Sequence, residues 1–160
     1  MYLSKEEILK RIEKEKLLEN LREENIQGAG VDLEIDELYR IASSSFLGKK
    51  ERRLPKLEKV DSFVLAPREY YLCVTREKVN MPLDLVAFIF PRSTLFRCGV
   101  SLMTAVVDPG YTGKLTMGMK NETCYEFKLE RHARIAQIVF CLVKGRTIGY
   151  RGKYQGGKVV

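Results

Sequence analysis

The runs Tyr70-Tyr71-Leu72-Cys73-Val74-Thr75 and Leu85-Val86-Ala87-Phe88-Ile89-Phe90 decide the fold. Both are short, apolar or alternating, and rich in β-branched and aromatic residues, which is the pattern of β-strands. Similar runs recur at Phe63–Leu65, Leu115–Met119, Tyr125–Leu129 and Ile135–Val143. Turn residues separate the runs: Pro67, Pro82, Pro91, Gly99, Pro109-Gly110, Gly113 and Gly145. Many short strands at this spacing predict a mainly β domain, either a sandwich, a barrel or a jelly roll.

The N-terminal residues follow a helical pattern instead. Ser4-Lys5-Glu6-Glu7 is a capping box, which predicts that a short helix begins there. Ile8, Leu9 and Ile12 give one apolar stripe, and Leu17, Leu18 and Leu21 continue it in a second short helical piece. We therefore expect residues 1–24 to form an N-terminal helical segment. The alternating run Val31–Ile35 is predicted as the first strand.

The length of the chain, 160 residues, predicts a single domain spanning 1–160. No apolar run approaches the roughly 20 residues of a membrane span, and the N-terminus is charged where a signal peptide is apolar. We therefore expect a cytoplasmic protein without a membrane partner. The glycine-rich residues 149–160 carry Arg151, Lys153 and Tyr154. They are predicted to be a C-terminal lid with functional groups or an ordinary frayed terminus.

Composition argues against several kinds of site. The four cysteines stand alone among apolar neighbours, which indicates buried free thiols rather than a zinc site. The only histidine, His132, occupies a predicted turn, so a histidine metal centre or a Ser-His-Asp triad has little support.

The net charge of +7 is compatible with nucleic acid, an anionic surface or a phosphorylated small molecule. One basic stretch lacks interleaved aromatic residues and is predicted as a solvated loop rather than a nucleic-acid face. Its members are Lys49, Lys50, Arg52, Arg53, Lys56 and Lys59. The scattered basic residues Arg92, Arg97, Arg134 and Lys153 suit point contacts to a triphosphate.

Asp108 is held where an apolar strand ends in the turn Asp108-Pro109-Gly110-Tyr111. Pro109 and Gly110 fix the backbone direction, while Asp108 and Tyr111 project from the turn. Asp108 could orient a water as general base, bind a ligand hydroxyl or cap the turn. The turn alone favours the cap.

Two further segments offer phosphate-binding groups. Pro91–Gly99 follows a strand and contributes the hydroxyls of Ser93 and Thr94 with the guanidinium groups of Arg92 and Arg97. It is a polyphosphate cradle or a polar turn whose arginines form surface ion pairs. Arg134 and Gln137 begin a strongly apolar strand. A buried Gln137 amide needs a partner such as a ligand phosphate or a neighbouring subunit, and a surface-facing Gln137 does not.

Taken in order, five segments resemble the motifs of the trimeric dUTPase and dCTP deaminase family. They are Gly28–Leu33, Pro91–Leu95, Asp108–Gly113, Arg134–Gln137 and Lys153–Gly156. The resemblance covers nearly the whole chain and implies a dUTPase-like jelly-roll or β-barrel. It also implies a homotrimer with sites between subunits, deoxyuridine triphosphate as substrate, and Mg²⁺ bound through the substrate phosphates.

The resemblance also separates hydrolysis from deamination. Leu3–Ile8, Leu65–Leu72 and Lys153–Gly156 are similar to the deaminase branch of the family. Family deaminases use a glutamate ten residues beyond the aspartate as proton shuttle, and this chain has Gly118 there. We therefore expect an archaeal-type dUTPase that hydrolyses dUTP to dUMP and pyrophosphate. The alternatives are a dCTP deaminase, alone or coupled to hydrolysis, that uses Glu122, and a non-catalytic nucleotide-binding regulatory homologue.

The same resemblance implies roles for the motif residues. Asp108 is the general base for attack of water at the α-phosphorus, and the ring of Tyr111 packs against the deoxyribose. Phosphates are held by Ser93, Thr94 and Arg97, braced by Arg92, Arg134 and Gln137. Backbone groups between Gly99 and Gly113 read the uracil, and Lys153 and Tyr154 close over the bound nucleotide.

Overall fold

The computed structural model describes all residues, 1–160, and confirms the mainly β fold with a short N-terminal helix. The helices are α1 (Lys5–Glu15) and α2 (Ser93–Arg97), with a 3₁₀ turn at Glu23–Asn25. The strands are β1 (Leu18–Glu19), β2 (Ile26–Gln27), β3 (Gly30–Ile41), β4 (Phe46–Leu47), β5 (Arg52–Arg53), β6 (Leu57–Lys59), β7 (Val64–Leu65), β8 (Tyr70–Asn80), β9 (Leu85–Pro91), β10 (Val100–Met103), β11 (Val106–Val107), β12 (Thr112–Asn121), β13 (Phe127–Lys128) and β14 (Arg134–Leu142). None of the helices has the length and apolar run needed to cross a membrane.

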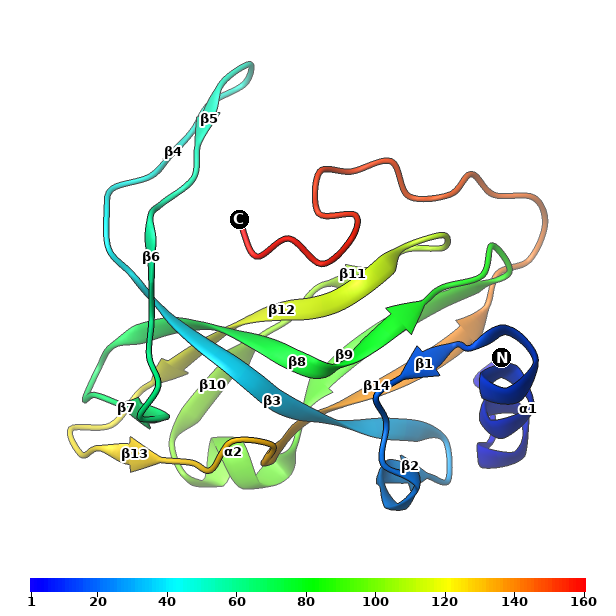
Figure 1. The fold of residues 1–160 in the computed structure, drawn as a ribbon, viewed down its shortest axis with the longest axis horizontal. Helices are drawn as coiled ribbons and strands as arrows, with labels where there is room; N and C mark the ends of the chain where they lie inside the picture. The colour runs from blue at the N-terminus through cyan, green and yellow to red at the C-terminus, as the bar shows by residue number, and fades with distance from the viewer.

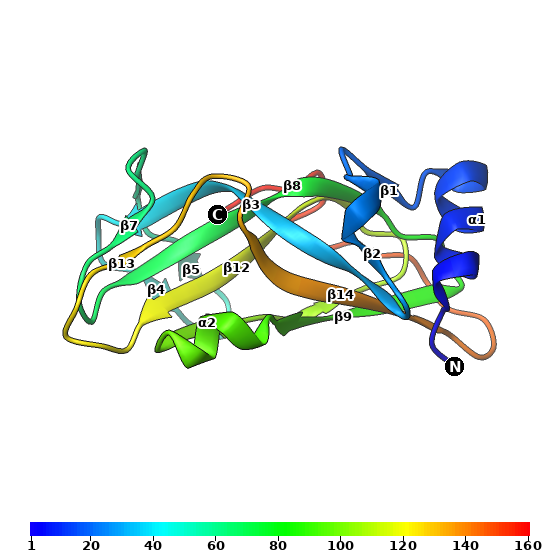
Figure 2. The ribbon, with the colours of Figure 1, turned by 90° about the horizontal axis from the view of Figure 1, so that it is seen from below.

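One curled antiparallel sheet forms the body, in the order β10-β12-β8-β3-β14-β9-β11 (Figures 1 and 2). The long strand β3 joins the two halves of the sheet, because its first half pairs with β14 and its second half pairs with β8. The pairing register shifts between Ile35 and Glu37, where the strand passes from one half to the other. Such a bulge bends a strand and increases its twist.

The core lies inside the curl of this sheet. Leu115, Met117 and Met119 alternate along β12 and are all buried, as the period of two predicts for a half-buried strand. Leu33 and Phe140, from β3 and β14, are fully buried in the same apolar cluster. Burying a side chain of this size contributes roughly 1.5–3 kcal/mol, so these strands anchor the loops that carry polar groups.

The N-terminal helix begins where the sequence predicts and ends earlier. The Ser4 hydroxyl accepts a hydrogen bond from the Glu7 amide at 3.4 Å, as a capping box requires. Lys16 takes a left-handed conformation, φ 54°, and ends α1 after Glu15. The predicted second helical piece over Leu17–Leu21 is wrong, because β1 pairs with β8 there and buries Leu18. The run Val31–Ile35 belongs to β3, which two short strands precede.

The basic stretch is exposed, as predicted, but only part of it is a loop, because Arg52, Arg53 and Lys59 lie on short strands. β4 and β5 form a hairpin outside the main sheet, and the Gly48 amide donates to the Glu51 carbonyl at 2.8 Å in its turn. β6 pairs with the end of β3. Figure 1 shows this hairpin, residues 46–53, projecting from the body as an arm. We call it the β4–β5 arm.

The cysteines are free thiols as predicted, but only one is buried. Burial raises the pKa of the Cys73 thiol to about 12, so it remains protonated. Cys98 and Cys124 are exposed, because each lies in a turn and not in an apolar strand. His132 occupies a turn with φ 67°, as predicted.

Candidate active site

The Asp108 turn is held by backbone hydrogen bonds to the chain before β9. Gly110 has φ 78°, and its amide donates to the Met81 carbonyl at 3.0 Å. The Tyr111 carbonyl accepts from the Met81 amide at 2.8 Å. Asp108 itself is bonded only through its carbonyl, which accepts from the Tyr111 amide at 3.2 Å. Its exposed carboxylate caps no turn and pairs with no cation within the chain, so it remains free for chemistry.

The C-terminal residues 149–160 lie across this turn (Figure 1). The Gln155 side chain binds the turn twice: its amide nitrogen donates to the Gly110 carbonyl and its oxygen accepts from the Thr112 amide, each at 2.9 Å. The ring of Tyr150 stands edge-on to that of Tyr111, with centroids 5.4 Å apart. The tail therefore has specific contacts with the turn that carries Asp108.

A close backbone approach fixes this tail. A Cβ atom on Gly113, whose φ is 149°, would lie 2.3 Å from the Gly157 nitrogen. Only glycine allows two backbone segments to approach this closely. The close packing of these two segments thus explains Gly113 and Gly157.

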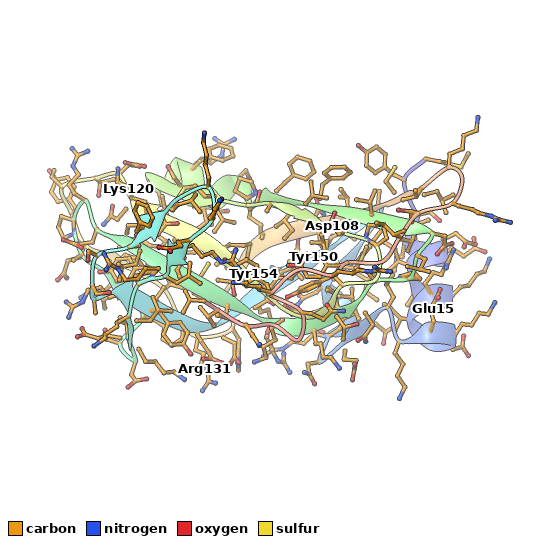
Figure 3. All side chains as sticks on the ribbon, turned by 90° about the horizontal axis from the view of Figure 1, so that it is seen from above. Glu15, Asp108, Lys120, Arg131, Tyr150 and Tyr154 are labelled. Atoms are coloured by element: carbon orange, nitrogen blue, oxygen red, sulfur yellow. The ribbon has the colours of Figure 1, made fainter.

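A pocket of about 270 Å³ opens between the turn, β12 and the tail. It is lined by Ile89, Ala105, Val106, Val107, Asp108, Tyr111, Leu115, Thr116, Tyr150, Tyr154, Lys158 and Val159. Figure 3 shows Asp108 beside Tyr150 and Tyr154 in the middle of the molecule. Among these mostly apolar walls, the Thr116 hydroxyl is buried without a hydrogen-bond partner, so a bound molecule could supply one.

Tyr111 is held in place by a hydrogen bond and by burial. Its hydroxyl donates to the Lys114 carbonyl at 2.7 Å, and the ring is buried. Burial, and secondarily the neighbouring Tyr150, raises the pKa of Tyr111 above its ordinary value. Tyr111 therefore presents a neutral ring in a fixed orientation.

A second polar cluster forms at the other end of β9, around the buried carboxylate of Asp32. Arg92 is ion-paired with Asp32, and Arg134 lies 3.4 Å from the same oxygen. Gln137 is the register partner of Asp32 on β14. The structure thus brings Arg92, Arg134 and Gln137 together around an aspartate that sequence reasoning missed. The sequence does contain a signal for this cluster, because Asp32 lies within an alternating apolar run. A carboxylate that is buried in such a strand needs a cationic or hydrogen-bonding partner.

Ser93, Thr94 and Arg97 lie on α2, beside this second cluster, and are exposed. Arg97 has no acidic partner, and its guanidinium carbon lies 5.8 Å from the centre of the Phe96 ring. Val107, the residue before Asp108, pairs with Ala87 of β9. Arg92 follows the end of β9, five residues after Ala87. That spacing is about 16 Å in an extended chain. Within one chain, the phosphate-binding candidates of α2 therefore do not meet Asp108.

Gly118 lies on β12 beyond the pocket, where its neighbour is Tyr70. A Cβ atom at this position would be 2.2 Å from the Tyr70 hydroxyl and 3.1 Å from the Met103 Cε. A longer side chain at position 118 therefore requires the Tyr70 ring to move.

Glu122 lies past the end of β12 and does not line the pocket. It accepts a hydrogen bond from Ser101 at 3.0 Å and pairs with Lys120 at 2.8 Å. Asp108 is therefore the one carboxylate of the pocket wall.

The donor groups also limit how a metal could bind. No three His, Cys, Asp or Glu side chains of the chain come close enough to hold an ion together. Mg²⁺ usually keeps several waters and binds through one or two carboxylates plus substrate phosphates. A single free carboxylate, Asp108, fits Mg²⁺ carried by a triphosphate and does not fit a cage of protein ligands.

Comparison with solved structures identifies the class of fold. The chain is similar to a 2′-deoxycytidine 5′-triphosphate deaminase from Agrobacterium tumefaciens, with a TM-score of 0.70 and 23% sequence identity. The match covers 87% of this chain and 47% of the deaminase, so the chain spans about half of that protein. At this identity the likeness establishes the fold alone.

Sequence comparison identifies the family. The sequence pattern described as dCTP deaminase-like matches residues 2–143. A probable deoxyuridine 5′-triphosphate nucleotidohydrolase of Archaeoglobus fulgidus is 36% identical over 98% of this chain and 97% of its own length. A dCTP deaminase of Pyrococcus furiosus is 37% identical over 91% of this chain and 88% of its own length. The chain belongs to the dCTP deaminase-like family, in which proteins named for hydrolysis and for deamination are about equally similar to it.

Proposed function

We propose that this protein is a dUTP diphosphatase, with Asp108 as the general base. One observation carries the choice between hydrolysis and deamination: Gly118, with the Tyr70 ring beside it, stands where the family resemblance places the deaminase glutamate. Glu122 is an unsuitable substitute because it is ion-paired outside the pocket. The unpaired Asp108 remains as the pocket's only carboxylate.

Asp108 accepts a proton from the water that attacks the α-phosphorus. The new bond joins the water oxygen to that phosphorus, the bond to the β-phosphate bridging oxygen breaks, and pyrophosphate leaves from dUMP. A positioned base contributes about 10²–10⁴-fold to such a step. Mg²⁺ on the triphosphate supplies charge neutralisation when bound.

Tyr111 positions the sugar. Its ring is fixed by the hydrogen bond to Lys114 and by the edge contact with Tyr150, so it offers a rigid wall to the deoxyribose. A 2′-hydroxyl would meet this wall, which selects deoxynucleotides. Thr116, whose hydroxyl is buried without a partner, offers the nucleoside a hydrogen bond. Tyr154 and Lys153 of the tail close over the nucleotide.

The phosphates are held by Ser93, Thr94 and Arg97 of a neighbouring subunit. The separation of about 16 Å along β9 supports this assignment, because α2 does not reach Asp108 of its own chain. The ion pairs of Arg92 and Arg134 with Asp32 brace the cluster, together with Gln137.

A homotrimer with sites between subunits is supported by exposed apolar side chains on β9, α2 and β11. Phe90, Phe96 and Val106 are each at least half exposed, at 52%, 57% and 50%. Exposed apolar side chains that belong to adjoining elements are typical of surfaces that bind another protein. Burial against a second copy would cover them.

The assay that tests this function uses dUTP and dCTP in parallel. The protein is incubated with each nucleotide and Mg²⁺, and pyrophosphate and ammonia are measured. We expect pyrophosphate from dUTP and no ammonia from dCTP. Ammonia from dCTP would establish the deaminase, and the absence of both products would favour a nucleotide-binding regulatory protein.

A further inference from the structure

A second, basic pocket adjoins the Asp108 pocket. It has a volume of about 350 Å³ and is lined by Arg52, Leu54, Lys153, Tyr154, Lys158 and Val160. Tyr154 and Lys158 belong to both pockets, so the two share a wall. The first pocket is mostly apolar, whereas the second has three cationic side chains and no acidic side chain.

The three cationic side chains of this basic pocket have no acidic side chain as a partner. Arg52, Lys153 and Lys158 form no ion pair with any carboxylate of the chain, although basic residues elsewhere, such as Arg40 and Lys114, do. Like charges that line one pocket repel one another. A polyanion in the pocket would relieve this repulsion.

The β4–β5 arm gives Arg52 a defined position. The guanidinium carbon of Arg52 lies 5.8 Å from the centre of the Tyr154 ring, within the range of a cation–π contact. Arg53 is next on β5, and successive side chains of a strand point to opposite faces. Accordingly, Arg53 does not line the basic pocket. Figure 1 shows the C-terminus between the arm and the strands of the sheet.

We propose that Arg52, together with Lys158, forms a polyphosphate subsite that continues the nucleoside pocket of the same chain. A planar guanidinium group binds two phosphate oxygens at once, and the lysine adds a point charge. The arm thereby binds the outer phosphates of the substrate. The identity of the nucleotide rests on the proposed function, but the preference for a polyphosphate rests on the charges of the pocket.

The test compares Arg52→Gln with its matched control, Arg53→Gln. Each variant removes one charge from the same strand, so both have the same effect on net charge. Calorimetric titrations use three probes with Mg²⁺ at low salt: sodium tripolyphosphate, the α,β-imido analogue of dUTP, and dUMP. We expect Arg52→Gln to weaken tripolyphosphate and the analogue about tenfold, as for one charge-assisted contact. Binding of dUMP should be unchanged, and Arg53→Gln should match the wild type.

Lys158→Gln provides a second variant, on the tail rather than on the arm. It should weaken the same two probes and spare dUMP. Equal affinities of Arg52→Gln and Arg53→Gln for tripolyphosphate would overturn the subsite. So would an equal loss with both variants, because that result means a general effect of charge.

The subsite and the proposed function fail in different ways. One outcome is that the wild type releases no pyrophosphate from dUTP, while Arg52→Gln binds tripolyphosphate more weakly than the wild type does. That result supports the subsite and contradicts the diphosphatase. The other outcome is that the wild type hydrolyses dUTP and that Arg52→Gln and Arg53→Gln have the same KM for dUTP as the wild type. That result supports the diphosphatase and contradicts the subsite.

Discussion

Replacing Gly118 tests whether Tyr70 occupies the place of a deaminase glutamate. In Gly118→Glu the new Cβ would lie 2.2 Å from the Tyr70 hydroxyl and 2.9 Å from its Cζ, so the ring must move. Tyr70 is 36% exposed, which lets the ring swing outward while it loses part of its packing. Overpacking of this kind lowers the free energy of unfolding by about 2 kcal/mol.

A double-mutant cycle isolates this contact. Tyr70→Ala alone removes ring packing, and Tyr70→Ala with Gly118→Glu removes the atoms that clash. If the contact exists, the double variant is more stable than the sum of the single changes predicts, by about 1–2 kcal/mol. Urea unfolding of the four proteins gives these values. Additive changes, or a Gly118→Glu protein as stable as the wild type, would refute the reasoning.

Three other predictions concern pH, the tail and the metal. Burial raises the pKa of the Glu77 carboxyl to about 7 in the folded protein, from about 4.5 in the unfolded chain. As pH rises, the unfolded chain therefore loses the Glu77 proton before the folded protein does. The free energy of unfolding of the wild type falls between about pH 4.5 and pH 7. Urea unfolding should therefore show Glu77→Gln gaining about 3 kcal/mol on the wild type between pH 4 and pH 8, and a constant difference would contradict the buried proton. Tyr150→Ala removes the edge contact with Tyr111 and should raise the KM for dUTP about fivefold, while Tyr150→Phe, which keeps the ring, should stay within about twofold. EDTA should abolish pyrophosphate release and added Mg²⁺ should restore it, whereas activity that persists in EDTA would exclude the magnesium-loaded substrate.

Much of the fold was predictable because it depends on local alternation. β9 and β14 each lie within one residue of the predicted runs, since their apolar residues face the core. The β4–β5 arm was not predictable, because each of its strands has only two exposed residues, which is too short to show an alternating pattern. The end of α1 depends on Lys16 in a left-handed conformation, which lysine rarely adopts.

The candidate site was predictable only where one turn contains it. Asp108 and Tyr111 share a Pro-Gly turn whose chemistry is visible in the sequence. Tyr70 beside Gly118, and Arg52 beside Tyr154, are contacts between segments far apart in the chain. Such contacts depend on how the sheet curls and where the tail lies, so no local pattern marks them.

Asp108→Asn tests the central claim most directly. The change keeps the shape of the side chain and removes the base, while Asp61→Asn, at an exposed aspartate away from the pocket, is the matched control. Pyrophosphate release from dUTP and the affinity for α,β-imido-dUTP are measured for both variants. We predict that Asp108→Asn lowers kcat about 10³-fold with affinity within about twofold, and that Asp61→Asn changes neither. An Asp108→Asn protein that keeps wild-type pyrophosphate release would contradict the account.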